Sequence, residues 1–358
     1  MKKVVILSAV NIKHMSLISL YTNYLEKNNI PYDIIYMDKY GEKEQIGAQK
    51  IYRFVNVIEQ SWSRKKKIIR YFRFYGYAKK ILEKNKYDRI IVWNDVAITM
   101  FGKYLAKHWH KKYCLNIRDY NGENKWYIFN IFKHAIKEAA FTTISSEGFK
   151  VFLPPNDYIS LYSYNAELLK EIMPRTDIRE KGKPIRISFI GSVRFFDQNK
   201  RLVDAFKNDE RFELHYHGTN AEIIEQYASQ IGATNVRCSG TFPISQTTRF
   251  LEESDIINNV FGDNTVGVRT LTSIRLFHAA YMRVPILVTD GTYMQELIEK
   301  YKIGFSIKDI DNELPNAIYN WYVSLDHKEL EKGCVVLLEE ATNANKRFET
   351  VLAQWMAR

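Results

Sequence analysis

Cysteine is scarce in this sequence, and long hydrophobic runs are missing. The three cysteines, Cys114, Cys238 and Cys334, are far apart and odd in number, so neither a disulfide framework nor a metal cluster is predicted. No stretch approaches the roughly 18–20 uninterrupted apolar residues of a membrane span. The N-terminus, MKKVVILSAV, lacks a long apolar core and a small-residue cleavage site, and it is typical of a first strand. We therefore expect a cytoplasmic protein.

Charge and aromatic content are abundant instead. The 358 residues carry a formal net charge of +11, and aromatic residues make up 14% of the chain. A positive protein favours an anionic partner, which leaves nucleic acid, an anionic lipid surface or a phosphorylated substrate open. Composition alone does not decide among them. The length suffices for two domains, each with its own core.

The first half of the chain alternates strand and helix patterns. Residues 3–9 and 31–37 are apolar runs typical of strands, and helical spacing lies between them. This order predicts a βαβ unit and a parallel sheet. Ligands bind such sheets at the carboxyl ends of the strands, which places Asn11 and His14 at a functional edge. The alternative is that His14 merely precedes a helix.

Three further predicted strands, at 87–93, 113–117 and 141–145, each end in polar residues. Asn94 and Asp95 follow the first, and Arg118 and Asp119 follow the second. Strand tips of this kind line a ligand cleft in parallel sheets. Asp119, His14 and Asp95 are, in that order, the candidates for a catalytic base. A structural ion pair is the alternative for Arg118 and Asp119.

A basic and aromatic segment occupies residues 62–87. Its apolar residues fall at helical spacing with lysines and arginines around them, as in helices that lie in the headgroups of an anionic bilayer. A surface helix packed on its own domain is the alternative, and nucleic-acid binding is disfavoured because no known module surrounds the segment. The residues expected to contact the membrane are Trp62, Lys65, Lys66, Lys67, Arg70, Phe72 and Arg73.

The regular spacing of apolar residues weakens between residues 154 and 184. A strand pattern begins again at 185–190. Prolines, Gly182 and mixed charges mark a linker, so we expect a domain boundary near 170–184. The second half again alternates strand and helix, which predicts another doubly wound α/β domain. The expected domains are 1–172 and 184–338, with a C-terminal helix at about 340–358 packing back on the first.

Within this pattern, three pieces of the second half resemble glycosyltransferases of the GT-B fold, particularly those of bacterial capsule and surface-polysaccharide assembly. Residues 188–194 (SFIGSVR) look like the strand, glycine turn and arginine that meet a donor diphosphate. Residues 240–242 look like a loop that contacts the nucleotide base. Residues 273–285 resemble the family's basic-Leu-Phe helix and proline, with Arg275 where many members have lysine, and residues 291–296 resemble the turn and glutamate that follow.

The resemblance implies two Rossmann-like doubly wound parallel-sheet domains facing across a cleft, with the donor bound by the second domain. Backbone amides and a guanidinium would stabilise the charge of the leaving nucleoside diphosphate. The donor-binding residues that it implies are Gly191, Ser192, Arg194, Lys200, Gly218, Phe242, Thr272, Ser273, Arg275, Thr292 and Glu296.

The sequence departs from the family at several of these places. Many retaining members have two glutamates with seven residues between them where this chain has Thr270 and His278. Arg118-Asp119 stands where a His-Asp pair often occurs, and Asn199 stands where a basic residue is expected. These departures leave the subfamily and the stereochemical outcome open.

The resemblance therefore implies a metal-independent glycosyltransferase of the hexosyltransferase type without a cofactor. Its expected donor is a nucleotide-sugar with UDP, and its expected acceptor a glycan linked to polyprenyl diphosphate in cell-surface polysaccharide assembly. We expect it on the inner face of the plasma membrane as a peripheral protein, and a homodimer is left open. The alternatives are a non-catalytic GT-B partner subunit and a nucleotide-sugar 2-epimerase of the same architecture.

Overall fold

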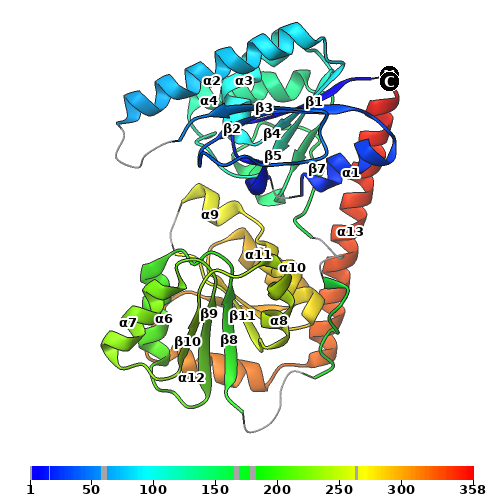
Figure 1. The fold of residues 1–358 in the computed structure, drawn as a ribbon. Helices are drawn as coiled ribbons and strands as arrows, with labels where there is room; N and C mark the ends of the chain where they lie inside the picture. Colours follow the sequence, from blue (N-terminus) through cyan, green and yellow to red (C-terminus); the bar gives the residue numbers. More distant parts are fainter. Residues whose placement is uncertain (1, 16, 58–62, 165–168, 178–182, 263–264) are drawn as a thin grey trace. The chain divides into compact units, whose positions relative to one another are not determined.

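The structure is a computed structural model. It describes residues 2–15, 17–57, 63–164, 169–177, 183–262 and 265–358 (Figure 1). Contacts divide the chain into two compact units. Met1–Tyr162 together with Ala344–Arg358 form the N-terminal unit, and Ser163–Asn343 form the C-terminal unit. Each unit is built on one parallel sheet, which confirms the predicted α/β class.

The N-terminal unit has seven parallel strands in the order β3-β2-β1-β4-β5-β6-β7. Helices α2, α3 and α4 cover one face of this sheet, while α1 and the end of α13 cover the other (Figure 1). The strands are β1 (Val4–Ser8), β2 (Tyr32–Asp38), β3 (Lys50–Val55), β4 (Arg89–Trp93), β5 (Tyr113–Ile117), β6 (Thr142–Ile144) and β7 (Ile159–Ser160). The helices are η1 (Ile12–His14), α1 (Ser19–Lys27), α2 (Arg64–Asn85), α3 (Asp95–His108), α4 (Trp126–Glu138) and η2 (Glu147–Val151).

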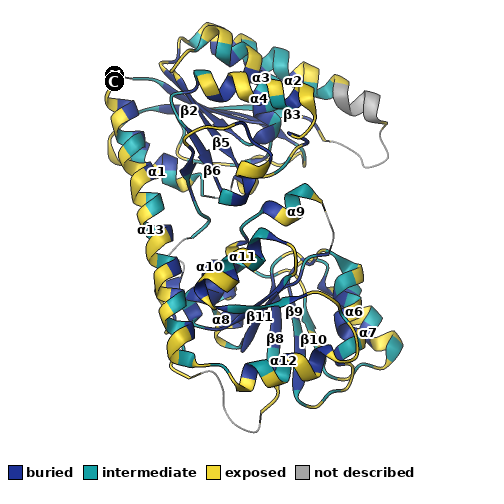
Figure 2. Cartoon of the chain, turned by 180° about the vertical axis from the view of Figure 1, so that it is seen from behind, coloured by how far each residue is buried: buried dark blue, intermediate teal, exposed yellow. Residues whose placement is uncertain are grey.

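Burial explains the uninterrupted apolar runs of the central strands. All five residues of β1, β4 and β5 are buried, because helices cover the sheet on both faces (Figure 2). Part of that cover is contributed by the C-terminal helix α13 (His327–Ala357), whose Phe348, Leu352 and Trp355 pack with Tyr21 of α1. The last residues of the chain therefore belong to the core of the N-terminal unit.

The C-terminal unit has six parallel strands in the order β10-β9-β8-β11-β12-β13. Its core joins the sheet to α6, α7 and α12 on one face. The strands are β8 (Ile185–Ile190), β9 (Phe212–His217), β10 (Val236–Ser239), β11 (Ile256–Asn259), β12 (Ile286–Thr289) and β13 (Gly304–Ile307). The helices are α6 (Phe196–Phe206), α7 (Ala221–Ile231), η3 (Ile244–Gln246), α8 (Thr247–Glu252), α9 (Val266–Thr270), α10 (Ile274–Met282), α11 (Tyr293–Tyr301) and α12 (Leu314–Val323).

The limits of the units differ from the expected limits of the domains. The segment before residue 172, expected in the first domain, belongs to the C-terminal unit because its apolar side chains are buried there. Tyr164 packs against Phe277, with ring centroids 6.0 Å apart, and Ile172 is buried. Arg175 forms an ion pair with Asp255 of the same unit at 2.5 Å.

In both sheets the strand order reverses its direction at the first strand. β1 lies between β2 and β4, and β8 lies between β9 and β11. Loops that leave the carboxyl ends of two such strands diverge toward opposite faces and leave a crevice between them. The residues that follow β1 and β4, and those that follow β8 and β11, are therefore the first places to look for a site in each unit.

Candidate functional site

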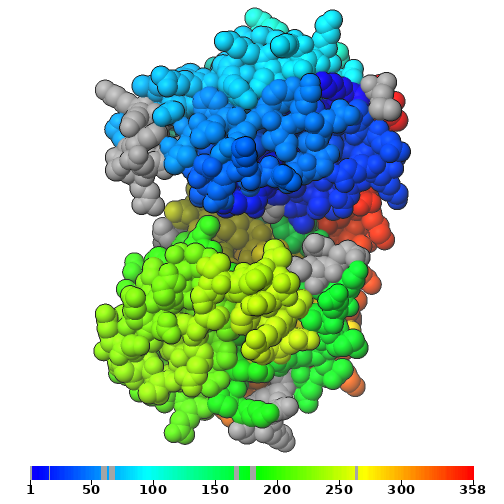
Figure 3. Space-filling model, in the orientation of Figure 1, coloured from blue at the N-terminus to red at the C-terminus, as the bar shows by residue number. Residues whose placement is uncertain are grey.

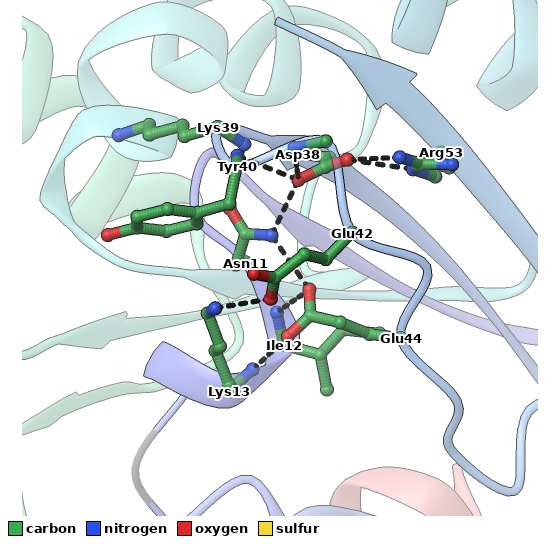
Figure 4. A network of polar contacts seen from close by, with 10 residues as sticks. Asn11, Ile12, Lys13, Asp38, Lys39, Tyr40, Glu42, Glu44 and Arg53 are labelled. Carbon is green, nitrogen blue, oxygen red and sulfur yellow. Dashed lines mark hydrogen bonds and ion pairs between the residues drawn. The ribbon is translucent and has the colours of Figure 1, made fainter. Parts of the chain in front are cut away.

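The loop after β1 is fixed by a polar network around Asn11 (Figure 4). The buried Asn11 amide donates to the carboxylates of Asp38 and Glu44, at 2.8 Å each. Glu44 also accepts the backbone N–H groups of Ile12 and Lys13, at 3.0 and 2.7 Å. These bonds satisfy donors that the short helix η1 leaves open at its start. The network holds η1, and with it His14, against the loop that follows β2.

Asp38 is the ionised centre of this network. Its carboxylate accepts from Arg53 Nε at 2.8 Å and from the backbone N–H groups of Tyr40 and Gly41. Burial opposes ionisation, but the hydrogen bonds from Asn11 and these groups outweigh it and lower the pKa of Asp38 to about 2. The Asp38 side chain therefore stays charged at neutral pH, and its hydrogen bonds hold the loop that follows β2 in place.

The three catalytic candidates meet at one cavity of the N-terminal unit. A cavity of about 380 Å³ lies at the carboxyl ends of β1, β4 and β5. His14, Asp95 and Asp119 all line it, and they follow three different strands, β1, β4 and β5. The parallel sheet brings the carboxyl ends of these strands to the same edge, as the sequence predicted. The other residues that line the cavity are Val10, Trp93, Asn94, Val96, Arg118, Tyr120 and Asn121.

Asp95 lies at the back of this cavity, in the first turn of α3. The preceding Asn94 has φ +75°, a backbone conformation that residues other than glycine rarely adopt. Its side-chain Oδ1 caps α3 by accepting from Ala97 N at 3.0 Å. Asp95 Oδ2 accepts the backbone N–H of Asp119 at 3.1 Å. Burial first, and then the charge of Glu123, raise the pKa of Asp95 well above its usual range. At neutral pH this carboxyl resists ionisation.

Glu123 supports the wall of the cavity through Asn121, and the sequence did not indicate this role. Its side chain is fully buried, and it accepts the backbone N–H of Asn121 at 2.6 Å. Burial raises the pKa of Glu123 to about 7. The segment Asp-Tyr-Asn-Gly-Glu has the composition of an exposed turn, so periodicity gives no sign of this burial. The one available signal is a second carboxylate four residues after Asp119.

Asp119 differs from both, because it is exposed at the cavity. Its Oδ1 accepts the backbone N–H of Tyr120 at 2.8 Å. The neighbouring Arg118 donates to the carbonyl oxygen of Leu161 at 3.0 Å, and burial lowers the pKa of its guanidinium to about 10. Asp119 is thus the carboxylate of this group that meets solvent and any ligand.

An apolar groove adjoins the acidic cavity in the same unit. It has a volume of about 510 Å³ and shares Val96 and Asn121 with the cavity. Aromatic residues of α2 form one side, and Phe72 is 70% exposed. The remaining lining residues are Tyr71, Tyr75, Thr99 and Met100.

The two halves of helix α2 differ in how far their apolar side chains are buried. Phe74, Ala78 and Leu82 are buried, whereas Ile69 and Phe72, at 55% and 70%, are exposed. The second half of the helix therefore packs on its own unit, while the first half presents apolar side chains to solvent. Figure 3 shows the surface of this unit, with α2 and α3 in blue and cyan.

The expected membrane residues are described only in part. Arg70 is half-buried on α2, and Arg73 is exposed. Trp62 and the side chains of Lys65, Lys66 and Lys67 lie outside the described residues. No helix within the described part of the chain is long and apolar enough to cross a membrane.

In the C-terminal unit, two glycines and an arginine meet at the carboxyl end of β8. Gly191 has φ +117° and Gly218 has φ +133°, and a Cβ on Gly218 would come within 2.1 Å of the Gly191 carbonyl oxygen. Only glycine fits this close approach. Arg275 of α10 donates through Nε to the carbonyl oxygen of Ile190 at 2.8 Å, and its guanidinium lies 3.9 Å from the ring centroid of Phe189. The guanidinium is therefore held directly beside the turn.

Arg275 lies on the same helix as His278, one of the two residues that stand where many members of the resembled family have glutamates. Burial first, and then the positive charge of Arg194, lower the pKa of Arg275 to about 9. His278, one turn further along α10, is buried and neutral, because burial and Arg275 lower its pKa to about 4. Thr270 is buried and donates to the carbonyl oxygen of Val266. An anion bound here would relieve the repulsion between the two guanidinium groups.

Two of the remaining hydroxyl candidates, Ser273 and Thr292, serve as helix caps. Ser273 caps α10, with Oγ accepting from Arg275 N at 3.3 Å, and its own N–H contacts Met294 of α11. Thr292 caps α11 and donates to the carbonyl oxygen of Thr289. Glu296 is exposed in the first turn of α11. Ser192 is exposed and Thr272 half-buried in the adjoining loops.

Two donor candidates lie elsewhere in the C-terminal unit. Phe242 follows β10 and packs edge-on against Phe250, 4.8 Å away between centroids, which places it near the ends of β9 and β10. Lys200 contacts α7, with Nζ 5.0 Å from the ring centroid of Tyr227. Asn199, where the family has a basic residue, is buried and donates to the carbonyl oxygens of Arg194 and Phe195.

Comparison with solved structures identifies the fold as GT-B. Sucrose-phosphate synthase from Thermosynechococcus elongatus matches with a TM-score of 0.68 and 11% identity, over 99% of this chain and 97% of that one. Anabaena HepE in complex with UDP and glucose matches with a TM-score of 0.65 and 10% identity, over 99% and 100%. The lipopolysaccharide outer core galactosyltransferase WaaB matches with a TM-score of 0.63 and 13% identity, over 98% and 99%. No protein-family model and no curated protein sequence matches the chain.

Proposed function

We propose that this protein is a glycosyltransferase that transfers a sugar from a UDP-sugar to a hydroxyl group of a lipid-linked glycan. The observation that carries the proposal is the Gly191 turn with Arg275 beneath it, in a chain with the GT-B fold. HepE, which shares this fold at 10% identity, binds UDP and glucose.

On the donor side, the C-terminal unit supplies positive charge and backbone N–H groups. Arg275 and Arg194 would hold the diphosphate, and the Gly191 backbone allows its close approach. As the bond between the anomeric carbon and the diphosphate oxygen breaks, negative charge grows on the leaving group, and these groups stabilise it. We propose that this replaces a metal ion and that no other cofactor takes part.

On the acceptor side, the N-terminal unit supplies a base. The acceptor oxygen forms a bond to the anomeric carbon, and its proton passes to Asp119 or His14, as in a reaction that inverts the configuration. Asp119 is the better candidate because it is exposed and has its carboxylate at the cavity. Asp95 is the least suited of the three, because its raised pKa keeps it protonated.

Two features support a lipid-linked acceptor. The cavity lining carries two carboxyl groups, which suits a neutral sugar better than a phosphate. The apolar groove that shares Val96 and Asn121 with it could hold part of a hydrocarbon chain. The exposed Ile69 and Phe72 with the basic start of α2 would then contact an anionic membrane surface.

Thermal unfolding with a panel of nucleoside diphosphates tests the donor site. UDP at a hundred times its Kd would stabilise a specific site by about 2.7 kcal/mol. Stabilisation by UDP and not by ADP or GDP is expected. No shift with any nucleotide would contradict the proposal and favour a non-catalytic partner subunit. Release of UDP with a changed free sugar, in the absence of acceptor, would favour the 2-epimerase instead.

A vesicle flotation assay tests the membrane contact. Replacing Ile69 and Phe72 together by serine should reduce binding to phosphatidylglycerol vesicles, because apolar area leaves the interface. Serine at Val335 and Val336, which are 39% and 38% exposed on α13, is the matched control. Equal flotation of both double variants would contradict the assignment of α2. Changing Lys65, Lys66 and Lys67 to alanine tests the electrostatic part separately.

A further inference from the structure

We propose that Tyr40 is a stacking platform for the acceptor glycan and binds the sugar unit next to the one that reacts. This inference rests on the proposed function, because it narrows the acceptor to a glycan with at least two sugar units. Neither the strand ends nor the resemblance indicated this residue.

Tyr40 lies in the loop that follows β2, directly beside a residue of the acidic cavity. Its ring centroid is 5.4 Å from that of His14, and the planes of the two rings are tilted by 42°. His14 lines the cavity, whereas Tyr40 is not among the lining residues. A sugar stacked on Tyr40 would therefore lie just outside the cavity, next to a sugar whose hydroxyl group faces Asp119.

The Tyr40 ring is both exposed and oriented by its neighbours. The side chain is 52% exposed. Besides His14, the ring contacts Lys13, whose Nζ lies 4.3 Å from the centroid (Figure 4). Lys13 is itself held by an ion pair with Glu42 at 2.6 Å. These contacts orient the ring and leave about half of the side chain open to a ligand.

Buried side chains fix the backbone that carries this exposed ring. Asn11 Oδ1 accepts the N–H group of Lys39 at 2.8 Å. Asp38 Oδ1 accepts the N–H groups of Tyr40 and Gly41, at 2.9 and 3.0 Å. Asn11 and Asp38 are both fully buried. An exposed aromatic ring on a fixed backbone loses little conformational entropy when a ligand binds, so Tyr40 is preorganised for contact.

The chemistry around the ring fits a carbohydrate. The face of an aromatic ring is electron-rich and attracts the C–H groups that a pyranose presents on one of its faces. The exposed Asp119 carboxylate in the adjoining cavity can accept hydrogen bonds from sugar hydroxyl groups. A nucleobase also stacks on aromatic rings, but the carboxylates of the cavity would repel the diphosphate attached to it.

Saturation-transfer NMR with methyl β-glycosides tests the platform in the full-length protein. Methyl β-cellobioside and methyl β-lactoside carry two sugar rings, and methyl β-glucoside and methyl β-galactoside carry one. In the wild type, at least one disaccharide should bind about three- to ten-fold more tightly than the monosaccharides, as expected from one aromatic contact. Tyr40→Ala should abolish this preference, and Tyr40→Phe, which keeps the ring, should retain it.

Tyr127→Ala is the matched control. Tyr127 is 49% exposed on α4 of the same unit and is not among the residues that line the cavity. This variant should keep the preference of the wild type. UDP affinity and flotation with phosphatidylglycerol vesicles should be equal in Tyr40→Ala and the wild type. Weaker UDP binding would place a nucleobase on the ring, and weaker flotation would place the membrane there; either result would overturn the proposal.

The binding measurement separates this inference from the proposed function. A disaccharide preference that is missing from the wild type, or that survives in Tyr40→Ala, would overturn the role of Tyr40 even if transfer from a UDP-sugar proceeds. A preference that depends on Tyr40, in a protein that transfers no sugar from any UDP-sugar, would instead overturn the proposed function alone.

Discussion

The two sheets of this protein share one strand order but carry opposite chemistry at their carboxyl ends. The edge of the C-terminal unit presents glycine backbone and two guanidinium groups, those of Arg194 and Arg275. The edge of the N-terminal unit gathers three carboxyl groups, those of Asp95, Asp119 and Glu123, with Arg118 as the cation that interacts with Asp95. The chain has a net charge of +11, so the cluster of carboxyl groups in the N-terminal unit runs against its overall charge.

This difference shows how topology and charge divide the work. The doubly wound sheet brings loops together at its switch point whatever their sequence. The side chains on those loops then decide between an anion and a neutral acceptor. The positive edge suits a diphosphate whose charge grows in the transition state, and the negative edge suits the removal of a proton from a hydroxyl group.

The largest effect is expected from a substitution at the acidic edge, by which we mean the carboxyl ends of the strands in the N-terminal unit. Asp119→Asn keeps the shape of the side chain and removes its basicity, so kcat should fall by about 10²–10⁴. The Kd for UDP should not change, because the residue belongs to the other unit. Steady-state transfer assays together with calorimetric titration of UDP measure both. Wild-type turnover in this variant would leave His14 as the base.

The next largest effect is expected at the basic edge, by which we mean the carboxyl ends of the strands in the C-terminal unit. Arg275→Met should weaken UDP binding by about 2–3 kcal/mol, the contribution of a charge-assisted hydrogen bond. Arg275→Lys, which keeps the charge and matches many members of the resembled family, should lose less. Circular dichroism must show both variants folded, because Arg275 also supports the Ile190 carbonyl group. Equal affinity in all three proteins is the result that would refute the donor assignment.

A pH titration of donor binding sharpens the contrast. Burial and Arg194 hold the pKa of Arg275 near 9, so its charge, and with it the affinity for UDP, should decline as pH rises through about 9. Arg194→Gln removes the repulsion and should move this decline to higher pH. UDP titrations between pH 7 and 10 measure it. An affinity that stays constant over this range in the wild type would show that the bound anion does not depend on Arg275.

The smallest effect is expected in the polar network around Asn11, which holds η1 in place. Glu44→Ala removes the acceptor of two backbone N–H groups of η1, which should cost about 1–2 kcal/mol of stability by urea unfolding. Because η1 carries His14, a moderate fall of kcat should accompany it. Glu42→Ala, which removes only an exposed ion pair with Lys13, is the matched control and should be nearly silent. Equal losses in the two variants would contradict the role of the network.

Central strands could be predicted from the sequence, whereas two of the edge strands, β3 and β13, could not. β5 and β8 were predicted at their observed bounds, because strands buried on both faces give continuous apolar runs. β3 and β13 lie at sheet edges and are largely exposed or half-buried, so their patterns are weak and were not recognised. The second unit was expected as a domain, yet its start was placed too late, because the burial of Ile172 depends on tertiary contacts.

The candidate site was predictable to a similar degree. Strand-end position identified His14, Asp95 and Asp119, and the fold brings them to one cavity. Glu123 was missed because its burial comes from the folding of a turn, which local composition does not encode. Lys200 was assigned to the donor site by its neighbourhood in sequence, but the helical rotation of α6 directs it to Tyr227.

A crystal structure of the protein with UDP would locate the donor. We expect the diphosphate at the Gly191 turn, within hydrogen-bond distance of Arg275 or Arg194, and no nucleotide in the cavity beside Asp119. A diphosphate bound in that acidic cavity, or away from the Gly191 turn, would contradict this assignment.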